Sequence, residues 1–398
     1  MAIHYYFIES LAPLVFRSGK PFGAQAYQDD ATFPLPSSAA GLLRALTLEQ
    51  NQEGFKGHNN SQRATLSDDQ VNELRDITCM GALLAKQDEN HHITLLVPKP
   101  SDAVFFKNKD TRVTELIRLI PKQFDQDCGS DLHQKLIPVQ MEQNHKGKPE
   151  SGIKYWSLDD FVKWQNENVL DIRDIQENGL KSIPVDIRTH AALDNHSLAS
   201  DDGYLFQTAG LDLGHQKITS EQNTIWSNSR LVFVVGAECE LQQGLATFGG
   251  ERRLSHFKKV EQTLFPNMDV NLPQNIQLQK GFKLTLLTPS IFQNGYLPAW
   301  LDQETLTGTL PNSPHIQVAL KAVAVDRWLP VSGWDLQQWK PKAMRKAVAA
   351  GSVYWFEILS GTMTQQDIEH LWFKNLTDDP QDQKDGFGLT IIAAWSAQ

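Results

Sequence analysis

Residues 352–395 read SVYWFEILSGTMTQQDIEHLWFKNLTDDPQDQKDGFGLTIIAAW. The first part, Ser352–Leu359, is rich in aromatic and β-branched residues and therefore predicts a strand. A helix is expected over Thr364–Phe373, because its first residue and Asp367 resemble a capping box and apolar residues recur at helical spacing. Leu389–Trp395 predicts a closing strand. A strand, a helix and a strand in this order indicate a domain that mixes α and β structure.

Two further strands are expected before this segment, at Phe282–Leu287 (FKLTLL) and Ile316–Val325 (IQVALKAVAV). Upstream of them, Phe265–Pro273 (FPNMDVNLP) contains two prolines and two asparagines and is the best candidate for a linker. The expected order of three strands, a helix and a strand suits a ferredoxin-like unit whose early helix is replaced by a loop. A C-terminal domain is therefore predicted over residues 266–398.

The N-terminal part begins with a predicted strand at Ile3–Ile8 (IHYYFI). A helix should start at Ser37 or Ser38, because serine is a good N-cap and Pro36 is not expected inside the helix. Its apolar stripe consists of Ala39, Leu42, Leu43 and Leu46. A strand followed by a helix opens either a doubly wound fold or a ferredoxin-like unit, and the residues leave both open.

The rest of the predicted N-terminal domain, residues 1–265, contains one clear buried strand at Leu231–Val235 and a long polar stretch. That stretch, residues 107–185, is interpreted as a large insertion outside the core, and helices are expected within it at Thr114–Ile120 and Leu158–Trp164. A hairpin is expected around Gly203–Phe206.

The length of 398 residues exceeds what one hydrophobic core usually supports, so two domains are expected. Hydrophobic residues make up 40% and charged residues 21%, which excludes a wholly disordered, collagen-like or polytopic membrane protein. No secretion signal is visible, and three widely spaced cysteines form neither a disulfide framework nor a paired metal site. We expect a reduced, cytoplasmic protein without membrane association.

The net charge is −10, which argues against a free-standing nucleic-acid binder. Two clusters depart from this balance, because RRLSHFKK at Arg252–Lys259 and KPKAMRK at Lys340–Lys346 each contain four Lys or Arg and no acid. An acidic chain with two basic clusters is suited to binding a polyanion on one face. Solvated loops would produce the same pattern.

No familiar catalytic pattern is present: the sequence lacks a Gly-x-Ser-x-Gly elbow, a zinc-binding His-Glu-x-x-His helix and a Walker loop. His91 and His92 have no cysteine or carboxylate at ligand spacing. Gly386-Phe387-Gly388 precedes a strand, so it is no dinucleotide fingerprint. It suits a tight turn whose bare N–H groups could meet a phosphate, and an ordinary turn is the alternative.

Several turns combine glycine or exposed loop sequence with arginine and lysine, whose side chains suit phosphate. The long basic loop also contains Trp334 and Trp339, and cations with stacking surfaces are typical of single-stranded nucleic-acid sites. Packing in the core is the other interpretation of these tryptophans. The RNA-binding candidates are Arg17, Lys20, Arg188, His190, Gly249, Gly250, Arg252, Arg253, Lys342, Arg345, Lys346, Gly386, Phe387 and Gly388.

Taken in order along the chain, these motifs resemble the third Cmr protein, a RAMP-superfamily subunit of type III-B CRISPR effector (Cmr) complexes. The resemblance rests on short motifs that include residues 16–22 (FRSGKPF), 249–253 (GGERR), 288–292 (TPSIF), 331–335 (VSGWD) and 386–388 (GFG). It implies an α+β fold of two ferredoxin-like (RRM-related, RAMP) domains with large insertions.

The resemblance also implies a function, which is a non-catalytic subunit that binds the 5′ tag of the crRNA in an RNA-guided antiviral complex. The implied partners are the crRNA, the large polymerase/cyclase-like subunit and the first copy of the backbone RAMP subunit, and no cofactor is implied. Other RAMP proteins are metal-independent endoribonucleases with a His general acid or base. For that alternative, the candidates are His4, His190 and His256.

Overall fold

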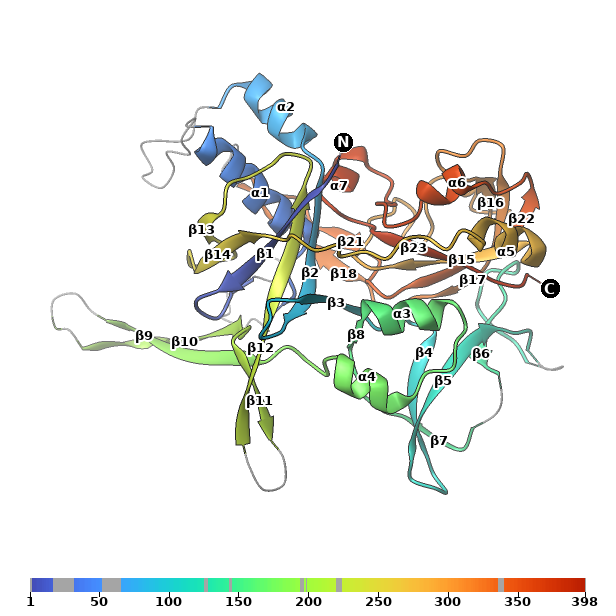
Figure 1. Cartoon of the computed structure of the whole chain (residues 1–398), viewed down its shortest axis with the longest axis horizontal. Helices are drawn as coiled ribbons and strands as arrows, with labels where there is room; N and C mark the ends of the chain where they lie inside the picture. Colours follow the sequence, from blue (N-terminus) through green and yellow to red (C-terminus); the bar gives the residue numbers. More distant parts are fainter. Residues whose placement is uncertain are drawn as a thin grey trace. The chain divides into compact units, whose positions relative to one another are not determined.

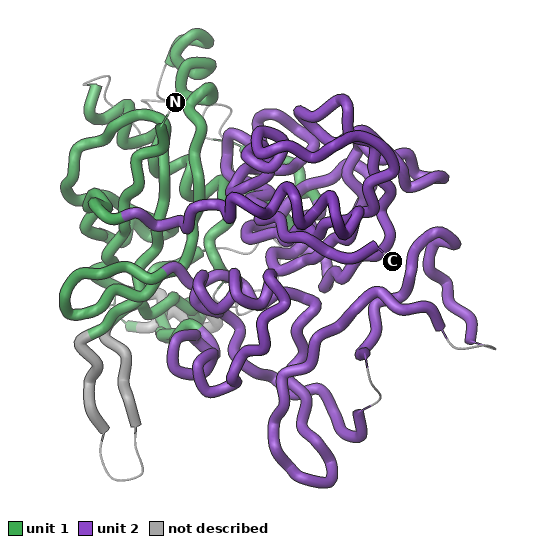
Figure 2. Tube along the Cα trace, turned by 45° about the vertical axis from the view of Figure 1, so that its right-hand side comes forward, with its two compact units in different colours: residues 1–94, 183–262, 330–345 green, residues 95–182, 263–329, 346–398 purple. Residues whose placement is uncertain are grey.

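The computed structural model describes residues 2–16, 32–51, 66–124, 128–142, 145–193, 197, 199–219, 224–335 and 340–397. The chain divides into two compact units (Figure 2). Unit 1 contains residues 1–94, 183–262 and 330–345, and unit 2 contains residues 95–182, 263–329 and 346–398. Helices and antiparallel sheets together confirm the α+β class (Figure 1). Among the described residues, no helix is long and apolar enough to cross a membrane.

The main sheet of unit 1 has the strand order β13-β14-β1-β12-β2. Its strands are β1 (His4–Ser10), β2 (Cys79–Gln87), β12 (Thr224–Ala237), β13 (Gly244–Thr247) and β14 (Leu254–Lys259). Neighbouring strands are antiparallel throughout. The predicted strands at Ile3–Ile8 and Leu231–Val235 are confirmed, and Tyr6 of β1 stacks on Phe257 of β14 with ring centroids 4.5 Å apart.

Helix α1 (Pro36–Gln50) buries the predicted stripe of Ala39, Leu42, Leu43 and Leu46. It begins at Pro36, so the expectation of a start at Ser37 or Ser38 is wrong. Proline is favourable in the first turn because the N–H that it lacks has no partner within the helix there. A second helix, α2 (Asp68–Asp76), begins with a true capping box between Ser67 and Gln70.

Two hairpins extend from unit 1. In the first, β9 (Val185–Leu193) pairs with β10 (Ser200–Leu211), with Phe206 opposite His190 and Thr208 opposite Arg188. This pairing confirms the hairpin expected around Gly203–Phe206, and Figure 1 shows it as a long two-stranded ribbon. In the second, β11 (His215–Thr219) pairs with the first part of β12.

Unit 2 contains the sheet predicted from the C-terminal sequence, in the order β16-β17-β22-β15-β23. Its strands are β15 (Gly281–Leu286), β16 (Thr307–Thr309), β17 (Gln317–Ala324), β22 (Val353–Ser360) and β23 (Thr390–Ala394). The stretch between β15 and β17 contains β16 and turns but no helix, as expected. Phe282 and Phe356 stack in its core with centroids 5.2 Å apart.

The helices of unit 2 are short. The predicted capping box of Thr364 and Asp367 is confirmed, but α6 (Gln365–Glu369) is shorter than the helix expected up to Phe373. α5 (Leu272–Gln279) lies at the end of the predicted linker and buries Leu272 and Ile276. The strand orders follow antiparallel pairs in both units, and the ferredoxin-like assignment stays a prediction.

Residues 95–182 belong to unit 2 and form structure of their own. They contain the end of β3 (Ile93–Pro98), β4 (Ala103–Asn108), β5 (Thr114–Pro121), β6 (Val139–Met141), β7 (Gly147–Pro149), β8 (Tyr155–Ser157), α3 (Leu158–Gln165) and α4 (Ile172–Asn178). The helix expected at Leu158–Trp164 is confirmed. The helix expected at Thr114–Ile120 is wrong, because that segment pairs with β4 as strand β5.

The interpretation of residues 107–185 as lying outside the core is also wrong. Trp156, Trp164 and Ile175 are buried together with Ala103 and Phe105 in a hydrophobic cluster. Most of this stretch belongs to the same compact unit as residues 263–329 and 346–398. The predicted domain boundary at residue 265 lies close to residue 262, where the chain passes from unit 1 to unit 2. The division into two independently folding domains stays a prediction.

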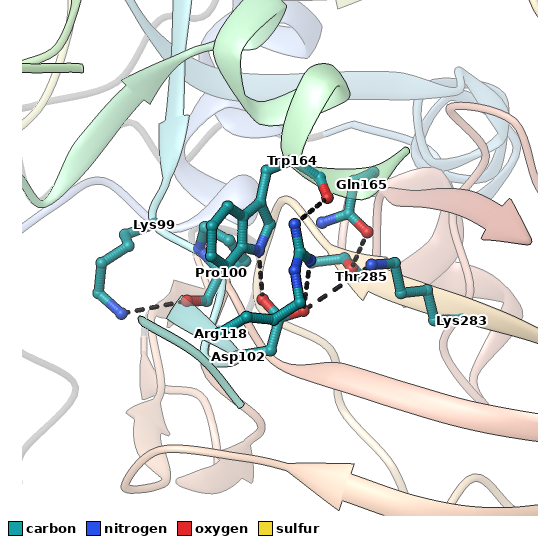
Figure 3. A network of polar contacts seen from close by, with 8 residues as sticks. All are labelled: Lys99, Pro100, Asp102, Arg118, Trp164, Gln165, Lys283 and Thr285. Carbon is teal, nitrogen blue, oxygen red and sulfur yellow. Dashed lines mark hydrogen bonds and ion pairs between the residues drawn. The ribbon is translucent and has the colours of Figure 1, made fainter. Parts of the chain in front are cut away.

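A buried charge network fastens this part of unit 2 (Figure 3). Asp102 is 1% exposed, and its Oδ1 accepts a hydrogen bond from Trp164 Nε1 at 2.8 Å. Its Oδ2 lies 3.7 Å from Arg118 Nη1 and 3.9 Å from Lys283 Nζ. The Arg118 guanidinium also stacks 3.6 Å over the Trp164 ring. The network therefore connects β5 and α3 to strand β15, which carries Lys283.

Candidate nucleic-acid interface

The basic loop predicted at Lys340–Lys346 contains two short strands, β20 (Lys340–Pro341) and β21 (Arg345–Ala347). β20 pairs with β19 (Trp334–Asp335), and β21 pairs with β18 (Leu329–Val331). Lys342 is held through its backbone, because its N–H donates to the Gly333 carbonyl at 2.8 Å and its carbonyl accepts from Ser332 Oγ at 3.0 Å. The backbone is thus fixed while the side chains are directed into solvent.

All seven residues of this loop are exposed. In the described part of the chain, no carboxylate forms an ion pair with Lys340, Lys342 or Lys346. In a chain of net charge −10, three exposed ammonium groups without a described counter-ion in so short a segment form a local basic surface.

The second predicted cluster starts at a tight turn before β14. Gly249 has a φ of +81°, and a Cβ there would lie 2.7 Å from the Val15 carbonyl oxygen, so only glycine fits. Gly250 donates its N–H to the same oxygen at 2.7 Å. Glu251 and Arg252 then both adopt the left-handed region, with φ of 57° and 50°, which costs free energy for non-glycine residues.

This cluster contains no acid in sequence, but the fold brings carboxylates to it. Arg253 Nη2 lies 2.5 Å from Glu251, Lys258 Nζ lies 2.6 Å from Glu9, and Lys259 Nζ lies 2.6 Å from Glu240. The hydrogen bond between Lys259 and Glu240 raises the pKa of the lysine and lowers the pKa of the carboxyl.

Three of the four cations in this cluster therefore have a carboxylate partner, and one of these carboxylates, Glu9, also pairs with Arg230. Arg252 is exposed and, among the described residues, has no ion-pair partner. The cluster at Arg252–Lys259 is thus free of acids in sequence but not in space, because antiparallel pairing of β14 with β1 places Glu9 opposite His256.

The glycine turn at residues 386–388 follows α7 (Pro380–Lys384) and has φ values of +96° at Gly386 and +75° at Gly388. Phe387 is 0% exposed. All three N–H groups donate within the chain, to the carbonyls of Gln383 at 3.1 Å, Asp382 at 3.0 Å and Pro289 at 2.8 Å. Of the two interpretations of this turn, these contacts favour the ordinary turn over bare amide groups, because all three N–H groups already have acceptors.

The remaining candidates lie apart from these turns in the sequence. Arg188 on β9 pairs with Asp186 at 2.6 Å, and His190 Nε2 lies 2.8 Å from Thr208 Oγ1 across the hairpin. Arg17, Lys20 and Trp339 lie outside the described residues, as does the side chain of Trp334. In the parts of the chain that the structure describes, no three His, Cys, Asp or Glu side chains gather at metal-binding distances.

Sequence reasoning overlooked Trp328, which is 54% exposed and has Lys346 Nζ 5.2 Å from its ring centroid. The sequence contains a signal for it, because the alternation of β17 ends at Ala324 and Trp328 follows two charged residues, Asp326 and Arg327. A tryptophan beyond the end of a strand, in a charged segment, is a poor candidate for the core.

Comparison with known proteins places these features in a family. Residues 6–395 match the family described as CRISPR-associated protein (Cas_Cmr3). No curated protein matches the chain. One chain of the cryo-EM structure of the type III-B Cmr-beta bound to cognate target RNA is similar, with 14% identity, a TM-score of 0.48 and coverage of 97% of this chain and 96% of that chain. A chain of the same complex bound to target RNA and AMPPnP (state 1) has 15% identity, a TM-score of 0.43 and coverage of 88% and 86%. The resemblance found in the motifs is confirmed by the family match along almost the whole length, and the chain belongs to the Cas_Cmr3 family of CRISPR-associated proteins.

Proposed function

We propose that this chain is a non-catalytic crRNA-binding assembly subunit of a type III-B (Cmr) RNA-guided effector complex. In this proposal it holds the 5′ tag of the crRNA and joins the large polymerase/cyclase-like subunit to the first backbone RAMP subunit. Membership of the Cas_Cmr3 family supports the setting. The observation that carries RNA binding is the exposed loop Lys340–Lys346, whose lysines lack counter-ions among the described residues.

The distribution of charge supports a narrow RNA-binding face. A chain with net charge −10 repels a polyanion at long range, so RNA contact requires a segment where cations outnumber carboxylates. Lys342, Arg345 and Lys346 lie in such a segment, and Arg252 adds one cation from a second turn. We therefore expect the isolated chain to bind RNA weakly and the assembled complex to bind it tightly.

The proposed surface retains the other candidates in lesser roles. Gly249 and Gly250 form the turn that exposes Arg252. Gly386, Phe387 and Gly388 form the turn before β23, and their N–H groups stabilise it by donating hydrogen bonds within the chain. Arg188 and His190 would contribute through the β9–β10 hairpin. Arg17 and Lys20 stay candidates from the sequence alone.

A nuclease would require a base close to the 2′-hydroxyl and a cation near the scissile phosphate. Of the histidines considered, His190 is engaged with Thr208, and His256 lies on β14 in register with Glu9. We propose that neither cleaves RNA. Purified chain incubated with guide precursor should leave it intact, with and without divalent metal. Discrete cleavage that disappears in His190→Ala or His256→Ala would replace this proposal with a RAMP endoribonuclease.

Co-purification tests the assembly role directly. The tagged chain, isolated from its native host, should bring down a ladder of backbone subunits, the large subunit and guide RNA, identified by mass spectrometry and RNA sequencing. Recovery of the chain alone with processed RNA would contradict the proposal, as would recovery of protein partners without RNA.

A further inference from the structure

We propose that Trp328 is a stacking platform for one base of the bound RNA and that Lys346 contacts the adjacent phosphate. This inference rests on the proposed function and adds to it a residue that stacks on a base. Both residues belong to unit 2. The juxtaposition that carries it is an exposed indole with an ammonium group, free of any described carboxylate, 5.2 Å from its ring centroid.

The exposure of Trp328 sets it apart from the other tryptophans. Seven tryptophan side chains are described, and the six others are buried or half-buried: Trp156, Trp164, Trp300, Trp355, Trp372 and Trp395. Trp328 alone among these seven is exposed, at 54%. A single exposed apolar residue is common, but Trp328 lies in the chain between the exposed side chains of Val325 and Leu329. Exposed apolar residues that gather in one patch point to a ligand or partner.

The neighbours of Trp328 are also exposed. Residues 325–328 follow β17 without regular structure, and every one of them is exposed, as is Leu329 at the start of β18. Arg327 has no ion-pair partner among the described residues, and its N–H donates to Asp326 Oδ1 at 2.7 Å. Two cations therefore accompany the indole, Arg327 beside it in the chain and Lys346 from β21.

Lys346 is suited to exchange one partner for another. Its ammonium group pairs with no described carboxylate, so the face of the indole is its contact in the free protein. The lysine stem is long and flexible. A base that stacks on the ring would displace the ammonium group toward the phosphate that flanks the same base. Stacking and phosphate contact thus use one pair of side chains.

Charge favours RNA over a protein as the occupant. The centre of a protein–protein interface is depleted of lysine, because burying an unpaired charge is costly. An aromatic ring beside unpaired cations is instead the combination that binds single-stranded nucleic acid without reading its sequence. The single acid of the 325–329 segment, Asp326, accepts a backbone hydrogen bond.

The test uses the assembled complex reconstituted with wild-type or variant chain. Its probe is a fluorescein-labelled synthetic RNA with the sequence of the co-purified guide, together with a series that carries one abasic nucleotide at each tag position. In Trp328→Ala we expect about 5- to 150-fold weaker binding, the range of base–aromatic stacking. Trp328→Phe should retain most of the affinity. Leu278→Ala is the matched control, because Leu278 is 71% exposed and lies on α5, outside both basic clusters.

The abasic series isolates the stack. One abasic position should weaken wild-type binding about as much as Trp328→Ala does, and the same position should cause no further weakening in that variant. Lys346→Gln should reduce the slope of log affinity against log salt by roughly 0.7.

The outcomes separate the two proposals. If wild-type complex binds RNA and Trp328→Ala binds it equally well, the stacking role is wrong and the proposed function stands. Additive effects of Trp328→Ala and every abasic position also contradict stacking. If Trp328→Ala instead prevents assembly without changing RNA affinity in the complex that forms, Trp328 is a protein contact and the stacking role is wrong. If wild-type complex does not bind RNA, the proposed function itself fails.

Discussion

At the scale of single residues, two glycines illustrate how backbone conformation limits the sequence. Gly388 has a φ of +75°, and a Cβ there would lie 2.1 Å from the Leu376 carbonyl oxygen. Gly41 lies in α1 and has no atom within 4 Å of an added Cβ. The same substitution should therefore have opposite effects at the two positions.

We predict that Gly388→Ala lowers the free energy of unfolding by clearly more than about 1 kcal/mol, because both φ and space oppose a side chain. Gly41→Ala should raise it by roughly 0.5–1 kcal/mol, because alanine favours a helix interior. Urea unfolding of the full chain measures both. Equal stability of Gly388→Ala and wild type would show that the turn adapts to a side chain.

Residue-scale reasoning from the sequence found the basic clusters but could not find their partners. The cluster contains three paired cations that are close to each other in sequence: Arg253, Lys258 and Lys259. The carboxylate that pairs with Arg253 is also close in sequence, whereas the carboxylates that pair with the two lysines are distant. Glu9 is 249 residues from Lys258 and meets it only because β1 and β14 are neighbours. Strand register, which the sequence does not reveal, decides which cations remain available.

At the scale of elements, the Asp102 network shows what joins the 95–182 segment to the rest of unit 2. Lys283 on β15 is 2% exposed, and burial lowers its pKa while Asp102 opposes that shift. Asp102 also faces Arg118, whose pKa burial lowers as well. One carboxylate therefore compensates two cations, and Asp102 is the centre of the network.

Removing the Asp102 carboxylate should lower the free energy of unfolding more than removing one of the cations that it contacts. Asp102→Ala leaves two cations without their carboxylate and should lower the free energy of unfolding by about 3–5 kcal/mol. Lys283→Met removes one buried charge and keeps similar volume, so it should cost much less. Thermal unfolding of both variants tests this order. A more severe effect of Lys283→Met would show that packing, not charge, dominates the site.

The lowered pKa of Lys283 makes stability depend on pH. Between this pKa and the ordinary lysine value of about 10.4, the unfolded chain binds more protons than the folded chain. The free energy of unfolding should therefore rise with pH through that window, and the rise should be smaller in Lys283→Met, but not absent, because burial also lowers the pKa of Lys86 and of Lys99. Comparison below about pH 10 is the cleanest, because burial raises the pKa of Tyr5 and Tyr155 to about 12 and opposes the effect above it. Identical pH slopes in both proteins would contradict it.

Elements are predictable where periodicity is strong. Four of the five strands of the C-terminal sheet, β15, β17, β22 and β23, follow from runs of apolar, aromatic and β-branched residues, and the stripe of α1 follows from apolar spacing. The structure of the segment Thr114–Ile120 is not predictable in this way, because its pairing with β4 overrides a spacing of apolar residues that also suits a helix. Helix α1 starts at Pro36 and helix α6 ends at Glu369, and both positions differ by a few residues from those expected. Capping and packing determine where a helix starts and ends, and the sequence shows them poorly.

At the scale of the whole molecule, family membership and charge distribution lead to the same account. The order of motifs along 398 residues is enough to indicate the family, and the match over residues 6–395 confirms it. The sequence does not show which of the two basic clusters keeps its cations without carboxylate partners, whereas the fold does. Lys340–Lys346 keeps exposed lysines without described counter-ions, and Arg252–Lys259 keeps one such cation, Arg252.

The most direct test of RNA binding by these cations is a salt titration of tagged guide RNA binding to the assembled complex. Each phosphate contact that a variant removes should lower the slope of log affinity against log salt by roughly 0.7. Lys342→Ala/Lys346→Ala should therefore lower it by roughly 1.4, and Arg252→Ala/Arg253→Ala by roughly 0.7, because Arg253 already pairs with Glu251. Both reductions should be similar for guides of different sequence. An unchanged slope and affinity in both double variants would contradict the account, and the RNA-binding surface would then have to lie near Arg17, Lys20 and Arg188.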